Sequence, residues 1–134
     1  MKGVRLFLFG FLAFTAAPSF AAPAVVSGKV FSRERIAPPP GYVLRIELRD
    51  ISRQDVASEE IAFVEMRPKR PLPVRYKLGY DPARIDPSHM YAVSARGLVD
   101  GRLVFISTII NSVITRGRPE ATDILVQSVG QLKR

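Results

Sequence analysis

The chain has 134 residues, of which 20 are basic and 12 are acidic, and it contains one histidine and no cysteine. This length suits a single domain with one hydrophobic core. Because cysteine is lacking, we expect neither disulfide bonds nor a lipid anchor on an N-terminal cysteine. The arginines are scattered rather than gathered in a stripe with aromatic residues, so we do not expect a nucleic acid as a partner.

Residues 1–21 have the three zones of a secretory signal peptide. Lys2 and Arg5 supply positive charge, residues 6–17 form an uncharged apolar run, and small residues precede the expected cleavage point at Ala21. The run is shorter than the roughly 20 residues that a transmembrane helix needs. We therefore predict an exported protein that is cleaved near Ala21. Its 18 basic and 12 acidic residues would leave a net charge of +6.

Residues 22–134 are expected to form one all-β domain, because apolar and polar residues alternate along much of this segment. For example, Leu44, Ile46 and Leu48 share one face of a predicted strand, and charged residues occupy the other face. The strand candidates are residues 25–32, 43–49, 61–66, 74–78, 91–96, 102–108 and 123–129. About seven short strands without a long helical segment predict an immunoglobulin-like antiparallel β-sandwich.

Two turns stand out between the predicted strands. Asp100 and Gly101 lie between two apolar runs, and both residue types tolerate the positive φ of a tight hairpin. Tyr91 opens a strand shortly after an Asp86-Pro turn, which resembles the tyrosine corner of immunoglobulin-like sandwiches. We interpret these four residues as structural.

No catalytic or metal-binding constellation is apparent, and we expect neither an enzyme nor a cofactor. His89 is the sole histidine, so a zinc site would have to be completed by carboxylates. Asp86, Ser88 and His89 are the residue types of a catalytic triad. However, neighbours in one turn point apart, whereas a triad converges from separate segments.

Three segments carry a resemblance to a known family: residues 26–41, residues 44–55, and residues 73–105 with the Asp-Pro turns and the Asp100-Gly101 hairpin. In this order they resemble the YbaY-like envelope lipoproteins, which are grouped with the YscW-type pilotins of type III secretion. The resemblance implies a small β-sandwich without enzymatic activity that faces the periplasm. The pilotins in this group escort a secretin subunit to the outer membrane.

This chain departs from the family pattern in two places. It lacks the cysteine that relatives carry after the signal peptide, which weakens the pilotin role because a pilotin lends its lipid anchor to its client. Residues 109–114 are also unusually apolar. They form either a covered strand, which we favour, or an exposed edge that invites a partner by strand addition.

The leading hypothesis is a non-enzymatic binding or assembly module whose partner is another envelope protein, for example a secretin or another outer-membrane protein. The alternatives are a binder of anionic glycan or lipid at the envelope surface, suggested by the positive charge, and an inhibitor of a hydrolase that inserts the proline loop at residues 38–40. The candidate partner-binding residues are Arg33, Glu34, Arg35, Arg67, Lys69 and Arg70.

Overall fold

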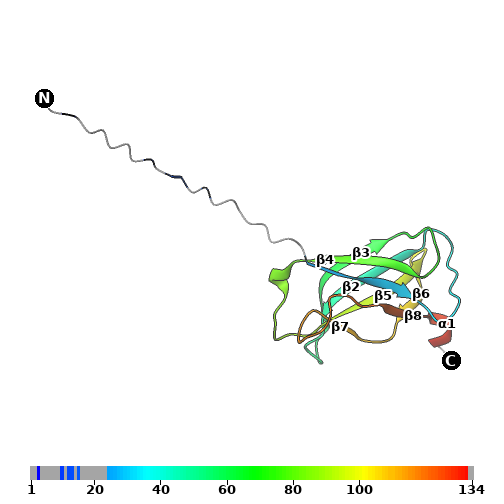
Figure 1. Cartoon of the computed structure of the whole chain (residues 1–134). Coiled ribbons are helices and arrows are strands. Elements are labelled where there is room, and N and C mark those ends of the chain that lie inside the picture. Colours follow the sequence, from blue (N-terminus) through cyan, green and yellow to red (C-terminus); the bar gives the residue numbers. More distant parts are fainter. Residues whose placement is uncertain (1–2, 4–9, 11, 14, 16–23, 133–134) are drawn as a thin grey trace.

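The computed structural model describes residues 3, 10, 12, 13, 15 and 24–132 (Figure 1). The predicted signal peptide at residues 1–21 lies largely outside the described residues, so its cleavage stays a prediction. Within the described part of the chain, no helix is long and apolar enough to cross a membrane.

The described fold is built almost entirely of strands. In chain order the elements are β1 (Ala24–Phe31), β2 (Val43–Asp50), β3 (Glu59–Met66), β4 (Val74–Tyr80), the 3-10 helix η1 (Pro82–Arg84), β5 (Tyr91–Val99), β6 (Arg102–Ser107), β7 (Asn111–Val113), β8 (Ile124–Ser128) and the short helix α1 (Val129–Leu132). The all-β prediction is therefore confirmed, and alternation explains it. Leu44, Ile46 and Leu48 of β2 are fully buried, as a strand with one core-facing side requires.

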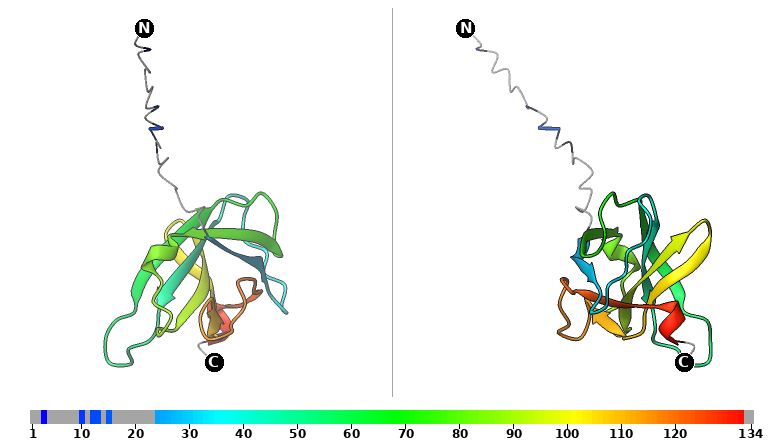
Figure 2. Two further views of the ribbon diagram at one scale, coloured as in Figure 1. Left: turned by 60° about the vertical axis from the view of Figure 1, so that its left-hand side comes forward. Right: turned by 90° about the vertical axis from the view of Figure 1, so that its right-hand side faces the viewer.

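The strands join in one sheet rather than in the two sheets of a sandwich. Its order is β3-β2-β5-β6-β8-β1-β4, with β7 paired to β5. The sheet curls on itself until its two end strands, β3 and β4, become neighbours, which makes a nearly closed barrel (Figures 1 and 2). The immunoglobulin-like sandwich is thus replaced by a barrel-like sheet, because alternation defines a buried face in either architecture.

One ladder also departs from the antiparallel prediction. β8 pairs in parallel with β1 through Val30 and Phe31, and antiparallel with β6 through residues 105–107. β8 thereby joins the β1–β4 pair to the rest of the sheet. Each of these two ladders contains only a few residues, so no local sequence pattern predicts them.

The apolar segment at residues 109–114 is not the covered strand that we favoured. Asn111–Val113 forms β7 and pairs with Tyr91–Val93, but Ile109 and Ile110 are 55% and 73% exposed. Val113 alone is fully buried there among the described residues of this segment. The hydrophobic run therefore contributes one fully buried side chain, Val113, a partly buried one that packs against the core, Ile114, and an exposed turn.

The core contains five large aromatic side chains that are at most 5% exposed: Tyr42, Tyr76, Tyr80, Tyr91 and Phe105. Phe105 lies over Gly97, its partner across the β5–β6 ladder. A Cβ added at Gly97 would lie 2.1 Å from the nearest ring atom of Phe105. Because the ring is fully buried, it has little room to move aside.

Replacing Gly97 by alanine is therefore expected to lower the free energy of unfolding by about 2 kcal/mol. Urea denaturation of the two proteins measures the difference. Adding Phe105→Leu removes the overlapping ring, so the double variant should lose less than the sum of the two single changes. Strict additivity would show that the ring and the glycine do not interact.

Candidate functional site

The candidate site is a groove along β4, where the barrel remains unclosed. β4 pairs with β1 on one side, and its other neighbour is β3, but no ladder joins β3 to β4 in the described part of the chain. The segment between them, residues 67–73, contains three prolines, which cannot donate ladder hydrogen bonds. At the opposite end, Arg84 Nη1 donates to the Ile61 carbonyl at 2.6 Å and so ties η1 to β3.

The groove has a volume of about 730 Å³ and is lined by three strands and one loop residue. Its lining residues are Ser27, Gly28 and Lys29 from β1, Val64 and Met66 from β3, Arg75, Tyr76 and Lys77 from β4, and Asp123. Val64 and Met66 lie opposite the fully buried Ile46 and Leu44 in the β2–β3 ladder, so they share the core-facing side. They remain half-buried because no strand pairs with β3 beyond them.

Gly28 and Tyr76 set the shape of the groove beneath β4. The two residues are partners across the β1–β4 ladder, and the Tyr76 hydroxyl donates to the Thr122 carbonyl at 2.7 Å. That carbonyl oxygen occupies the space beside Gly28 in which any other side chain would begin. Burial, with a smaller contribution from the charge of Asp123, raises the pKa of Tyr76 well above its usual value, so the phenol stays a neutral donor.

Three cations line the groove on the outward face of β1 and β4. Lys29 lies directly opposite Arg75 in the ladder, and Lys77 is two residues farther along β4 on the same face. Within the described residues, none of the three forms an ion pair with a carboxylate. Asp123 is the acid in the lining, and its carboxylate accepts the backbone N–H of Lys29 at 3.1 Å.

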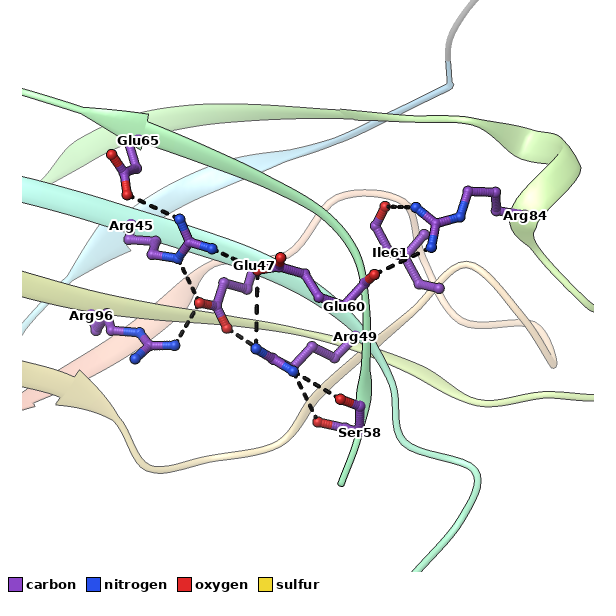
Figure 3. Close-up of polar contacts among 9 residues, drawn as sticks. All are labelled: Arg45, Glu47, Arg49, Ser58, Glu60, Ile61, Glu65, Arg84 and Arg96. Atoms are coloured by element: carbon purple, nitrogen blue, oxygen red, sulfur yellow. Dashed lines mark hydrogen bonds and ion pairs between the residues drawn. The ribbon is translucent and has the colours of Figure 1, made fainter. Parts of the chain in front are cut away.

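On the outward face of β2, β3 and β5, in contrast, the cations are paired with carboxylates. Three arginines converge on Glu47, whose side chain is only 3% exposed (Figure 3). Arg45 Nε donates to Oε1 at 2.6 Å and Arg49 Nε donates to Oε2 at 2.8 Å, while Arg96 also bonds to Oε1. Arg45 reaches Glu60 and Glu65 as well. The three positive charges on this face are therefore matched by three carboxylates.

The arginines determine the ionisation of Glu47. Burial by itself would raise the pKa of this carboxyl group, but the hydrogen bonds from Arg45 and Arg49 and the charges of Arg96 and Arg49 outweigh it and lower the pKa to about 2. Glu47 is therefore ionised at neutral pH, although it is almost fully buried. Alternation alone places Glu47 on an outward face and predicts that it is exposed.

The residues predicted for partner binding lie in two separate places. Glu34 is engaged by the fold, because its carboxylate accepts the Ser128 N–H at 2.7 Å next to α1, while Arg33 and Arg35 beside it are exposed. Arg67, Lys69 and Arg70 are exposed on the segment that joins β3 to β4. This second cluster adjoins the groove, and the first lies beyond the end of β1.

The residues proposed as structural belong to two turns. Tyr91 is 1% exposed, and its hydroxyl accepts the Asp86 N–H at 2.8 Å, five residues upstream. Asp100 and Gly101 join β5 to β6 with φ values of 49° and 76°.

His89 lies between two aspartates in the same region as Tyr91. Its Nδ1 is 2.6 Å from Asp50, and its Nε2 is 3.6 Å from Asp86. Ser88 donates its hydroxyl to Asp86 rather than to His89. The three residue types of a catalytic triad are therefore close together, but the hydrogen bonds do not run from serine to histidine to aspartate.

Sequence reasoning missed the groove residues of β4. Alternation along residues 74–78 by itself places Arg75 and Lys77 on the solvated face of a strand, because the pattern does not reveal what lies across the ladder. A signal was available in the pairing: if residues 25–32 pair with residues 74–78, Lys29 falls opposite one of the two cations. The sequence does not identify Val64 and Met66 as groove residues, because ordinary core positions in a strand show the same alternating pattern.

Comparisons with known proteins agree with this fold. The model of the family described as type III secretion system lipoprotein chaperone (YscW) matches residues 21–126. The uncharacterized lipoprotein YbaY of Escherichia coli (strain K12) is 34% identical over 113 residues, which make up 84% of this chain and 59% of that protein. An alternative pilotin from the type II secretion system of Vibrio cholerae superposes with a TM-score of 0.77 at 34% identity, covering 81% of this chain and 98% of that chain.

The resemblance noted from the three sequence segments is thereby confirmed. This chain spans 59% of the length of YbaY, so nothing about the remainder of that protein transfers to it. The match to the family model covers most of the domain, from the end of the predicted signal peptide into β8. The chain belongs to the YscW family of secretion-system lipoprotein chaperones.

Proposed function

We propose that this protein is a non-enzymatic binding and assembly module of the periplasm that holds a segment of another envelope protein. Membership of the YscW family carries the proposal, because that family is described as lipoprotein chaperones of a secretion system. The solved relative with the same fold is a pilotin of a different secretion system. The partner proposed for this chain is accordingly a secretion-system subunit, for example a secretin, or another outer-membrane protein.

The groove along β4 is the proposed binding surface. A volume of about 730 Å³ with both apolar and charged lining is suited to a few side chains of a bound segment. The exposed cluster of Arg67, Lys69 and Arg70 extends this surface beyond the end of β4. The exposed Arg33 and Arg35 are a separate surface with no adjoining groove lining.

Deleting the gene is expected to lower the amount of one secretion-system or other outer-membrane protein several-fold, while its transcript is unchanged. The physical reason is that an escorted subunit that lacks its chaperone exposes its assembly surface and is degraded or mislocalised. Quantitative proteomics of isolated outer membranes measures this, with a strain carrying the wild-type gene on a plasmid as the control. An outer-membrane proteome identical in all three strains would contradict the proposed function.

A further inference from the structure

The β1–β4 pair carries like charges where the ladder penalises them. Lys29 and Arg75 are direct partners, and Lys77 shares their face. Like charges placed directly opposite each other destabilise a strand pair. The Lys29 ammonium lies 5.9 Å from the Phe31 ring centroid, but among the described residues no carboxylate pairs with any of the three cations. The like charges therefore lower the stability of the isolated domain, and no ion pair among the described residues compensates for them.

The outward face of β2, β3 and β5 shows that this fold can offset repulsion between like charges. There, Arg45, Arg49 and Arg96 are matched by Glu47 and its neighbours through short hydrogen bonds. Both faces are outward faces of strands in the same sheet, and each carries three basic residues: three arginines on the first, and one arginine with two lysines on the β1–β4 face. The difference lies in the acids, which are present on β2 and β3, whereas β1 and β4 contain no aspartate or glutamate.

The unmatched charge continues beyond the groove. Arg67, Lys69 and Arg70 are exposed on the segment that leads directly into β4, and none of them takes part in an ion pair within the described residues. Exposed charges act on one another and on a ligand over roughly 10 Å in 0.1 M salt. The two clusters therefore attract an anionic partner together.

The apolar residues in the groove lining indicate that the partner has apolar groups as well as negative charge. Val64 and Met66 are half-buried and Tyr76, which also lines the groove, is buried, so the groove offers apolar contact beside its cations. A lipid headgroup or a phosphate would satisfy the charges and leave the apolar side chains uncovered. A peptide segment that carries both carboxylates and apolar side chains would satisfy both.

We propose, building on the function proposed above, that the groove along β4 binds an acidic segment of the partner protein, with its carboxylates beside Lys29, Arg75 and Lys77. Its apolar side chains cover Val64 and Met66 at the unclosed edge of the barrel. Asp123 marks the margin of the groove beside β1 and disfavours an acid at that point. The bound segment thus supplies the negative charge that the β1–β4 face lacks.

Site-specific photo-crosslinking in an envelope extract tests the location and the chemistry together. A photoreactive residue is placed at Gly79, an exposed β4 position with no atom within 4 Å of an added Cβ. The control position is Thr108, which is exposed just after β6. The full chain is used, and the crosslinked peptide is sequenced. The expected adduct at position 79 is a protein segment rich in aspartate and glutamate with interspersed apolar residues, and it is absent at position 108.

Four other outcomes would overturn the inference in distinguishable ways. A lipid or glycan adduct at position 79 would identify an anionic surface ligand instead of a peptide. A neutral or basic protein segment there would refute the charge argument. A protein adduct at position 108 but not at 79 would refute the groove while leaving the proposed function standing, whereas no protein adduct at either position, together with an unchanged outer-membrane proteome, would refute both.

The sequenced segment, made as a synthetic peptide, then tests the role of the cations. Arg75→Glu with Lys77→Glu should weaken its binding by at least about 30-fold, and raising NaCl from about 50 to about 300 mM should weaken wild-type binding by about 10-fold. Arg53→Glu with Arg102→Glu changes the net charge equally at exposed positions outside the groove lining and should weaken binding by less than about 3-fold. Equal losses in the two double variants would overturn the assignment.

The weaker binding expected of Arg75→Glu with Lys77→Glu should not result from unfolding of the variant. A glutamate at position 75 would face Lys29 across the ladder and replace a like-charge pair by an opposite-charge pair. The groove double variant should therefore melt at a temperature at least as high as that of the wild type. Circular dichroism measures this, and a lower melting temperature would show that the like charges are not a cost to the fold.

Discussion

Replacing Gly28 by alanine is expected to lower the free energy of unfolding by more than about 3 kcal/mol, a large part of the stability of a domain of this size. A Cβ at position 28 would lie 1.9 Å from the Thr122 carbonyl oxygen and 3.2 Å from a ring atom of Tyr76. The first contact is with backbone, which cannot rotate away. The Thr122 backbone is also held by its N–H bond to the Ser27 carbonyl at 2.9 Å and by the Tyr76 hydroxyl.

Gly79→Ala is the matched control, because Gly79 lies in the same pair of strands and nothing is within 4 Å of its added Cβ. It should change stability by less than about 1 kcal/mol, and in the stabilising direction, since alanine loses less backbone entropy than glycine. Urea denaturation of both variants and the wild type measures the difference. Similar losses in the two variants would mean that close approach to Thr122 does not explain the glycine at position 28.

Replacing Glu47 by glutamine is expected to cost about 3 kcal/mol at pH 7, because three guanidinium groups lose their shared counter-charge. The change preserves the shape of the side chain, so it reports on charge rather than on packing. Glu65→Gln is the control: Glu65 also bonds to Arg45, but it is 52% exposed, and its loss should cost less than about 1 kcal/mol. Equal effects of the two changes would contradict a special role for the buried carboxylate.

The pH dependence of stability separates this charge effect from any other cause. The pKa of Glu47 is lowered from 4.5 to about 2 in the folded protein, so the stability that its ionised form contributes is fully present above about pH 4.5. That stability is lost as pH falls towards 2. The lowered pKa corresponds to about 3 kcal/mol.

The free-energy difference between wild type and Glu47→Gln should therefore be constant from pH 7 to pH 5 and should shrink towards zero as pH approaches 2. Urea titrations at several pH values measure it. The lowered pKa values of Asp50 and Asp86 act in the same direction, but they are common to both proteins and cancel in the difference. A difference that stays constant down to pH 2 would show that Glu47 is not held ionised by its arginines.

The two outward faces of the sheet also differ in what they imply for function. The Glu47 cluster is electrically satisfied within the domain, and its hydrogen bonds stabilise β2 against β3 and β5. The β1–β4 face is left with unmatched positive charge beside half-buried apolar side chains. Charge on the first face therefore contributes to folding, and charge on the second is available to a partner.

The sequence by itself determined the all-β class, the approximate positions of most strands and the direction of their buried faces. These features are local: alternating residues define a face in any sheet, and Asp-Gly supports a tight turn wherever apolar strands flank it. Membership of the family also followed from the order of three sequence segments. The signal peptide at residues 1–21 remains a prediction of the same local kind.

Only the tertiary structure decided whether those strands form two sheets or one. The answer depends on the short ladders of β8 with β6 and β1, whose pairing energy is set by contacts between residues distant in sequence. The pairing of β2 with β5 places Glu47 among three arginines, and the pairing of β8 with β1 brings Thr122 against Gly28. The incomplete closure leaves Val64 and Met66 at an unpaired edge beside β4. Alternation between adjacent residues determines which face of a strand is buried. The groove, in contrast, depends on contacts between strands that are distant in the sequence.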